Sequence, residues 1–412
     1  MDTTNDETGP EAAVGTAEPE APGPFGGESD MAANPQPMFK AMREGSPVLA
    51  LQGSLILSRK VDIDEALRHP EIFTSNMSAV DLKNVRPLIP LQIDPPDHKK
   101  YRKLLDPIFA PRLMTAMEDE VAVLVNDLID RFIDRGEVDF AAEFSVPYPS
   151  QVFLTLLGLP LDELDRFLAM KDGIIRPDQI TGSPYGSEAA DAHQQKVADS
   201  IYAYFNQVLD ERQAESREDL VSRFLTAEVD GHTLTREDIL DICFLFLIAG
   251  LDTVTATLDC MFGFLTQHPE HRRQLAEDPS LIPSAIEELL RWETPVQMVA
   301  RSSLEETTLA GCPVHKGDSV ILLLGSANTD EAEVEDADTV RFDREVNRHI
   351  AFGGGVHRCL GSHLARMELR VALREWHRRI PEYSVAPGHS LVYTPNIRSI
   401  EHFPMRFTAA PA

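Results

Sequence analysis

Cysteine is scarce in this chain: among 412 residues it has only Cys243, Cys260, Cys312 and Cys359, with no CxxC pair. Their spacing excludes a dense disulfide framework and favours reduced thiols in a cytoplasm. Basic residues are also few, because 38 Lys and Arg stand against 67 Asp and Glu, and the formal net charge is −29. That balance excludes general nucleic-acid binding, which requires a basic surface.

We also expect no hydrophobic run that crosses a membrane. The most apolar stretch, ILDICFLFLIAGL at 239–251, is short and contains Asp241, so it predicts a buried core helix and no membrane anchor. The first residues lack the basic start and the apolar run of a signal peptide. We therefore expect a cytoplasmic protein.

What is present divides into two parts. Residues 1–34 are rich in Pro, Gly, Ala and acidic residues, a composition that predicts a disordered tail. Residues 35–412 contain no fixed repeat and no linker, and they predict a single large domain that is mainly α with a minor β portion.

Local patterns support that fold class. Thr235, with Asp238 three residues later, marks the start of a helix. Apolar residues recur at helical spacing in four long stretches, and two alternating runs predict strands with turns. The helical stretches are 113–135, 192–213, 236–266 and 360–378, and the strand runs are SPVLALQGSLILS and CPVHKGDSVILLL.

The stretch FGGGVHRCLG, 352–361, is the strongest candidate for a chemical site. Its Cys359 could be a buried small side chain, a catalytic thiol, a zinc ligand or an axial ligand of a larger cofactor. The glycines allow close backbone approach, and the amides of a helix beginning near Leu360 favour a thiolate. His357 and His363 lie nearby, but no second cysteine completes a zinc knuckle, which disfavours zinc.

This stretch resembles the haem-binding signature of the cytochrome P-450 superfamily of haem-thiolate monooxygenases. Every fixed position of that signature is met, by Phe352, Gly355, His357, Cys359 and Gly361. The resemblance covers roughly residues 35–412 and implies one domain with haem b between a central buried helix and the cysteine loop. It implies that Cys359 ligates the iron and that Phe352, Gly353 and Gly361 contact the cofactor.

A second motif lies upstream in AIEELLR. On their own, Glu288 and Arg291 at i, i+3 are a common helical ion pair. The resemblance implies that they form the structural ion pair of the haem-binding core, with Arg344 as its third member.

A third motif, AGLDTV, ends the apolar run at 249–254. Asp252 and Thr253 are polar groups in a stretch that should be buried, so they need partners. The resemblance implies that they are the acid–alcohol pair that relays protons during dioxygen activation, and that Ala249 and Gly250 contact the cofactor. Val254 departs from the family pattern, because many members carry a second hydroxyl residue there.

His98 and Arg102 share one helix face at i, i+4, which on its own is typical of a solvated basic surface. The resemblance implies that these residues, together with Arg301 and His357, bind the haem propionates. It gives His349 as a further candidate.

The resemblance also points to apolar residues that line a substrate pocket, although such residues could equally be ordinary core. They are Leu247, Val296, Met298, Val299 and Ile397. A small hydrophobic substrate of terpenoid or fatty acyl type is expected. Arg86 could pair with a substrate carboxylate or be an exposed loop arginine.

Basic residues gather in two places despite the acidic total, at 99–103 and at 358–379. They could be an ordinary solvated helix face, but the contrast with the net charge favours a docking face for an acidic ferredoxin, which with its reductase would supply electrons. The residues of this face are Arg358, Arg366, Arg370, Lys100 and Lys103.

The sequence therefore predicts a monomeric, ferredoxin-dependent monooxygenase. One alternative is a haem-thiolate enzyme that uses peroxide, for which Asp252 and Thr253 would be unnecessary. The other is a non-catalytic haem-binding sensor, which needs neither that pair nor a substrate pocket.

Overall fold

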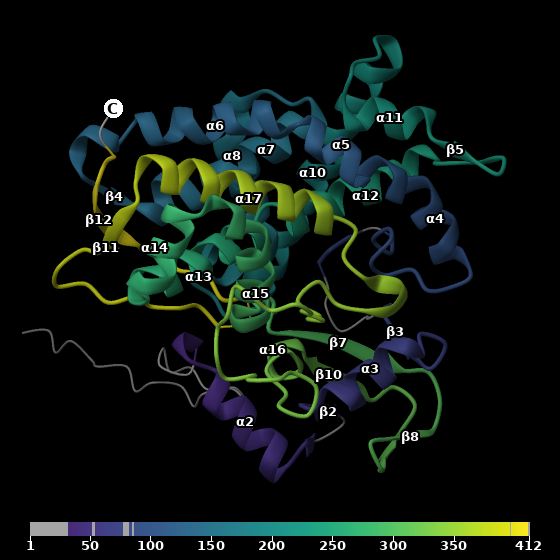
Figure 1. The fold of residues 1–412 in the computed structure, drawn as a ribbon. Helices are drawn as coiled ribbons and strands as arrows, with labels where there is room; N and C mark the ends of the chain where they lie inside the picture. Colours follow the sequence, from purple (N-terminus) through teal and green to yellow (C-terminus); the bar gives the residue numbers. More distant parts are fainter. Residues whose placement is uncertain (1–31, 52–53, 77–81, 85, 396, 411–412) are drawn as a thin grey trace, which may run out of the picture.

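The computed structural model describes residues 32–51, 54–76, 82–84, 86–395 and 397–410 (Figure 1). The predicted tail, 1–34, lies outside the described residues except for its last three positions. Two of these are anchored, because the Arg398 guanidinium donates hydrogen bonds to the carbonyls of Ala32 and Ala33, at 2.7 and 3.1 Å. Ordered packing thus begins before residue 35.

Helices dominate the described residues, as predicted. They are α2 (Gln36–Gly45), α3 (Lys60–Arg68), α4 (Asp97–Leu105), α5 (Pro111–Ala116), α6 (Glu118–Asp130), α7 (Pro147–Leu157), α8 (Leu164–Ile175), α9 (Pro177–Thr181), α10 (Glu188–Ala214), α11 (Leu220–Thr226), α12 (Arg236–Gly250), α13 (Thr253–Gln267), α14 (Pro269–Glu277), α15 (Ile282–Glu293), α16 (Leu324–Asn328) and α17 (Ser362–Arg379). Short turns of helix are η1 (Asp106–Phe109), η2 (Ile133–Arg135), η3 (Ala141–Ser145), η4 (Leu161–Glu163), η5 (Pro279–Leu281) and η6 (Gly355–His357).

The β portion is small and consists mainly of one five-stranded sheet in the order β1-β2-β10-β7-β3. In it β10 runs parallel to β2, and the other neighbours are antiparallel. Both predicted strand runs are confirmed, one as the hairpin β1–β2 and the other as β9 and β10. The strands are β1 (Val48–Leu51), β2 (Ser54–Leu57), β3 (Phe73–Thr74), β4 (Glu137–Asp139), β5 (Glu228–Val229), β6 (His232–Thr233), β7 (Met298–Ser303), β8 (Thr307–Leu309), β9 (Cys312–Val314), β10 (Ser319–Leu323), β11 (Glu382–Val385) and β12 (Pro404–Thr408).

The helices form the larger part of the molecule, and the five-stranded sheet lies below them in Figure 1, flanked by α2, α3 and α16. The centre of the helical part is aromatic. Trp376 of α17 is fully buried, with the rings of Phe132, Phe140, Phe144 and Phe262 within 6 Å of its own. A large, continuous core therefore fixes α13 and α17 relative to each other.

The central apolar stretch departs from the predicted single helix over 236–266. Its start is as predicted, because the Thr235 side chain accepts from the Asp238 amide while the Asp238 carboxylate accepts from the Thr235 amide. The helix then stops at Gly250 and resumes at Thr253 as α13. By length and composition, 236–267 could cross a membrane, but 78% of its most apolar window is buried inside the protein, as in a core helix.

Candidate functional site

The cysteine loop is shaped by backbone hydrogen bonds and by close packing on α3. The Cys359 amide donates to the Phe352 carbonyl at 2.9 Å, which closes the loop. Gly355 has φ +63°, and a Cβ at this position would lie 2.2 Å from the Leu67 carbonyl oxygen. No other residue fits there, so this glycine fixes how closely the loop approaches α3.

Cys359 is the one exposed cysteine of the four. It nevertheless lies among enough protein atoms that burial raises the pKa of its thiol, against the opposing effects of the Gly361 amide and of Arg102 and Arg358. The helix α17 begins at Ser362, later than predicted, and the amide of its N-cap residue Gly361 lowers the pKa of this thiol as predicted, but burial outweighs that effect. A positively charged ligand at this sulfur would favour the thiolate.

Among the described residues, two buried basic side chains near the cysteine loop, His98 and Arg301, have no carboxylate partner. The His98 and His357 rings lie 4.5 Å apart, and the buried Nε2 of His98 has no hydrogen-bond partner. Burial, with the neighbouring His357 and Arg102, lowers the pKa of His98 to about 4. Arg301 on β7 is also buried, and burial lowers its pKa. Within the described residues, no carboxylate forms an ion pair with Arg301.

The remaining predicted cations have partners inside the protein. His357 Nε2 lies 3.1 Å from Asp94 Oδ1. Arg102 donates to Asp106 Oδ1 at 2.7 Å and to the Arg358 carbonyl at 2.6 Å. His349, the further candidate, lies with its Nε2 3.0 Å from a Glu287 carboxylate oxygen.

The central helix has one accessible face at the predicted AGLDTV motif. Ala249 is exposed and Thr253 is half-buried, although most of α12 and α13 is buried. The Thr253 hydroxyl donates to the Ala249 carbonyl at 3.0 Å. A Cβ at Gly250 would lie 3.2 Å from the Phe153 ring, so this glycine lets α7 pack closely against α12.

Asp252 is buried, whereas the neighbouring Thr253 is half-buried, and the partners of Asp252 were not predicted from the sequence. Its carboxylate is buried and bonded to Lys171 Nζ at 3.0 Å and to Arg176 Nη2 at 2.9 Å. Burial alone would raise the pKa of Asp252, but the two cations outweigh it and keep the pKa below its usual value. Sequence reasoning missed both cations; the signal was Lys171 itself, in the apolar stretch FLAMKDGII of α8.

The predicted triad around Glu288 is assembled. Arg291 donates to both carboxylate oxygens of Glu288, at 2.9 and 2.8 Å, and Arg344 Nε donates to Oε1 at 2.9 Å. The Asn347 side chain and the Arg341 amide, both missed from the sequence, complete the carboxylate's partners at 2.9 Å each. These five hydrogen bonds offset the free-energy cost of burying the Glu288 carboxylate.

The predicted apolar substrate residues separate into three groups. Val296 and Ile397 form an isolated antiparallel bridge and are half-buried. Leu247, in contrast, is completely buried in the main core and has no surface to offer a ligand. Met298 and Val299 pack against the two clusters that flank the sheet. Arg86 pairs with buried Asp241, at 2.8 and 3.2 Å, so it is a structural residue.

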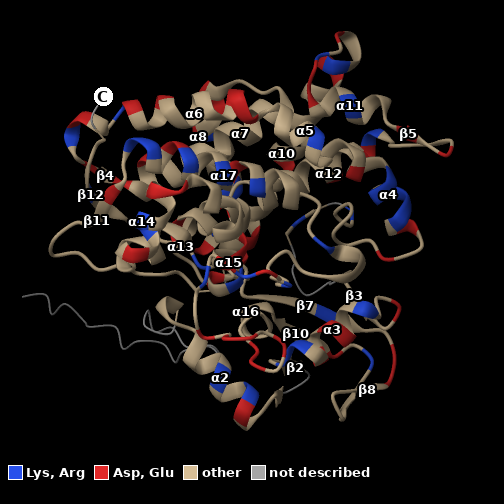
Figure 2. Ribbon diagram, in the orientation of Figure 1, with Lys and Arg blue, Asp and Glu red and all other residues tan. Residues whose placement is uncertain are grey.

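The predicted docking face is less basic than its sequence suggests, because α17 packs beside α6, which carries acidic residues (red in Figure 2). Arg370 bonds to Glu118, and Arg379 lies 2.6 Å from Asp130. Arg366 holds Glu287 through two contacts of 2.6 Å, with its guanidinium 4.4 Å from the Phe352 ring centroid.

On α4, Lys103 is paired with Asp230 at 2.6 Å. Lys99, Lys100 and Arg358 form no ion pair within the described residues.

Comparison with known proteins decides the family. Residues 48–379 match the family described as cytochrome P-450. Mycinamicin IV hydroxylase/epoxidase of Micromonospora griseorubida is 34% identical over 295 residues, 71% of this chain and 72% of that protein. Steroid C26-monooxygenase of Mycolicibacterium smegmatis is 32% identical over 378 residues, 90% and 92% of the two chains. A solved cytochrome P-450 from Chondromyces apiculatus is 31% identical with a TM-score of 0.83, covering 93% of this chain and 97% of that one.

The chain belongs to the cytochrome P-450 family. It is a cytochrome P-450 monooxygenase of mainly α fold, and the family carries a haem bound through a cysteine thiolate. The residues present fit such a group. An accessible thiol, an unpartnered buried nitrogen on His98 and a buried guanidinium on Arg301 match the iron and the carboxylates of a haem.

Proposed function

We propose that this cytochrome P-450 binds haem b through Cys359 Sγ, and that it inserts one oxygen atom from dioxygen into a small hydrophobic substrate. The observation that carries the assignment is the accessible Cys359 thiol in a loop beside His98 and Arg301, neither of which has a carboxylate partner within the described residues. Together with Arg102 and His357, which would share their contacts to Asp106 and Asp94, they would bind the propionates. When bound, haem supplies the oxidative chemistry, and a thiolate ligand favours O–O cleavage.

The chain's own residues would manage the protons. Thr253 Oγ1 holds a proton that is directed to the Ala249 carbonyl, on the accessible face of the central helix. In our proposal this hydroxyl delivers protons to the reacting centre, and Asp252 resupplies them. Asp252 must first exchange one of its bonds to Lys171 or Arg176. Glu288, Arg291 and Arg344 act only by holding the fold around the cysteine loop.

The substrate is proposed to be a terpenoid or fatty acyl compound, bound near Val296 and Ile397. Support comes from what similar proteins bind. A cytochrome P-450 from Bacillus megaterium, 29% identical with a TM-score of 0.80, is solved in complex with testosterone. Another solved relative, 26% identical, is complexed with hexadec-9Z-enoic acid on an acyl carrier protein. We further propose that residues 35–412 act as one monomeric, cytoplasmic domain.

The decisive experiment is spectroscopic. Reduced protein with carbon monoxide is expected to show the red-shifted Soret band of thiolate-ligated haem, and Cys359→Ala is expected to lose it. Cys312→Ala, which changes a cysteine on β9, is the matched control and should keep the band. A band that survives Cys359→Ala would contradict the ligand assignment. A low-to-high spin shift on titration with terpenoids, steroids and fatty acids then identifies the substrate class.

A further inference from the structure

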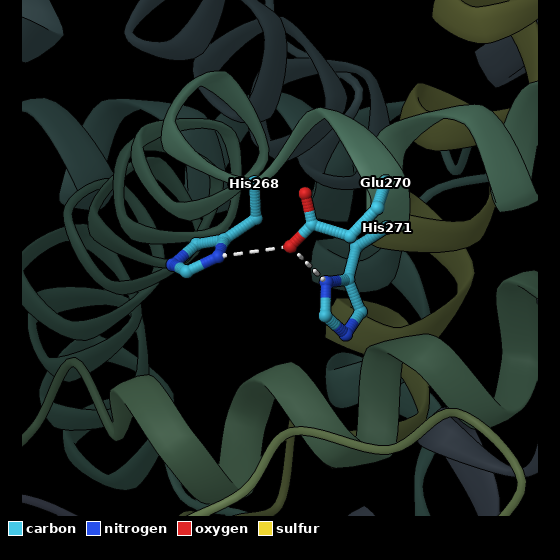
Figure 3. A group of neighbouring side chains, drawn as sticks. All are labelled: His268, Glu270 and His271. Atoms are coloured by element: carbon cyan, nitrogen blue, oxygen red, sulfur yellow. Dashed lines mark hydrogen bonds and ion pairs between the residues drawn. The ribbon is translucent and has the colours of Figure 1, made fainter.

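Two histidines and a glutamate converge at the corner between α13 and α14, among residues to which no role is assigned above (Figure 3). His268 follows the last residue of α13, and Glu270 and His271 lie in the first turn of α14. Glu270 Oε1 lies 3.2 Å from Nδ1 of His268 and 3.2 Å from Nδ1 of His271. One potential ligand atom from each residue lies within 4.8 Å of the other two.

The contact of the second ring nitrogen of His271, Nε2, indicates which nitrogen carries the proton. Nε2 lies 3.2 Å from the Val340 carbonyl oxygen, and a carbonyl can only accept, so Nε2 carries the proton. In a neutral imidazole, Nδ1 then directs its lone pair at the Glu270 carboxylate, and two acceptors face each other. Either a proton on Nδ1 or a metal ion between the two atoms resolves this conflict, and the zinc competition described below distinguishes the two. A histidine that donates one N–H to a backbone carbonyl while its other nitrogen faces a cation is the usual geometry of a metal ligand.

Neighbouring aromatic rings hold both histidines in place. The His268 ring stacks on Phe264 at 4.0 Å between centroids, and the His271 ring meets the edges of Phe264 and Phe342 at 5.4 and 5.1 Å. Little side-chain freedom remains to be lost when an ion binds. The site is open to solvent, because the side chains of His268 and Glu270 are 44% and 60% exposed.

The donor set selects the ion. Two imidazoles with one carboxylate suit zinc better than magnesium or calcium, which prefer oxygen ligands. Bonds of about 2.0–2.1 Å in a tetrahedron separate neighbouring ligand atoms by roughly 3.3 Å, close to the two distances of 3.2 Å seen here. We propose that His268, Glu270 and His271 bind a Zn²⁺ ion, with water completing its coordination.

Such an ion would brace the core around Glu288. Val340, the acceptor for His271, lies between Thr339, whose carbonyl accepts from Arg291 at 3.0 Å, and Arg341, whose amide donates to Glu288 at 2.9 Å. Fixing His271 therefore fixes the backbone that lines the Glu288 cluster. The site is structural and independent of the monooxygenase reaction.

Zinc binding is tested on the full-length, haem-loaded protein, by competition with a chromogenic zinc chelator and by thermal unfolding. Wild type is expected to take up one zinc per chain at this site and to unfold at a higher Tm with zinc. His271→Gln and Glu270→Gln should each weaken zinc binding about 10- to 100-fold and abolish the Tm shift. Glu270 is exposed, so that variant folds even where His271→Gln does not.

His69→Gln is the matched control. His69 Nδ1 lies 2.8 Å from Glu71 Oε1, at the same i, i+2 spacing but without a second histidine in the pair. It should leave the zinc affinity and the Tm shift unchanged. Equal zinc affinity in wild type and Glu270→Gln, or no zinc uptake by wild type, would overturn the proposal. Neither readout involves substrate turnover, so failure here leaves the proposed monooxygenase function untouched.

Discussion

At the scale of single residues, two cations hold the Asp252 carboxylate more firmly than proton delivery requires. Its two cations keep the pKa of its carboxyl low, so Asp252 stabilises the folded state above its unfolded pKa of about 3.9, and this stabilisation is lost as the pH falls below that value. Lys171→Met removes one cation and raises the pKa of Asp252. Breaking a buried pair costs up to about 3–5 kcal/mol, with the lower end expected because Arg176 remains.

The measurement is the free energy of unfolding of Lys171→Met between pH 4 and pH 8. The deficit relative to wild type should be largest at neutral pH and should shrink as the pH falls toward 4, because Asp252 is protonated first in the variant, where its pKa is higher, while in wild type it stays ionised. Asp172→Asn is the control: it removes a half-buried carboxylate that contacts Lys171 at 3.2 Å and Arg176 at 2.8 Å but leaves both cations on Asp252, and it should cost less than about 1 kcal/mol. A deficit that does not vary with pH would show that Lys171 acts only through packing.

At the scale of elements, Arg86 ties the loop before α4 to the central helix. Asp241 of α12 accepts from Arg86 and, at 2.9 Å, from the Tyr202 hydroxyl of α10. Burial raises the pKa of Asp241 despite these partners. Arg86→Ala leaves a buried carboxylate with fewer partners, so we expect a loss of about 1–3 kcal/mol in unfolding free energy and faster amide exchange over residues 86–93.

The pH dependence separates charge from packing in this case. Because the folded pKa of Asp241 lies above the unfolded value, its contribution to stability is most favourable at low pH and declines as the pH rises through the folded pKa. Arg86→Ala raises that pKa further, so its deficit should be largest at neutral pH and smaller near pH 4. Arg86→Ala combined with Asp241→Asn should recover part of the loss; no recovery would contradict the assignment.

The same elements show which features of the fold could be predicted from the sequence. The Thr235 cap, the β1–β2 hairpin and the Glu288–Arg291 pair depend on neighbours within a few residues, and all were predictable. The interruption of the central helix at Leu251 was not. There the Asp252 carboxylate is drawn to α8, and the Thr255 hydroxyl donates to the Ser145 carbonyl at 2.8 Å. Contacts made by residues some 80 to 110 positions away leave no trace in local periodicity.

At the scale of the whole molecule, local sequence also does not show which charges are neutralised by residues distant in the chain. The sequence shows six arginines in 358–379 but not the carboxylates of Glu118, Asp130 and Glu287, which the fold brings against them. Ion-paired arginines contribute little to a long-range field, so a predicted docking face for a ferredoxin would depend on its unpaired cations. Among the described residues of that face, those without an ion pair are Lys99, Lys100 and Arg358, of which Arg358 is next to Cys359 in sequence.

Reversing one of these unpaired charges therefore tests the proposed docking face. Arg358→Glu is expected to slow ferredoxin-dependent reduction about tenfold at low ionic strength, and the effect should fade as salt screens the field. Stopped-flow measurement of the reduction rate over a range of salt concentrations gives both the slowing at low ionic strength and its dependence on salt. Lys196→Glu, at an exposed position on α10, changes the net charge equally and should leave the rate unaltered. Equal slowing by both variants would mean that the total charge of the protein, and not a local face, governs the approach of the ferredoxin.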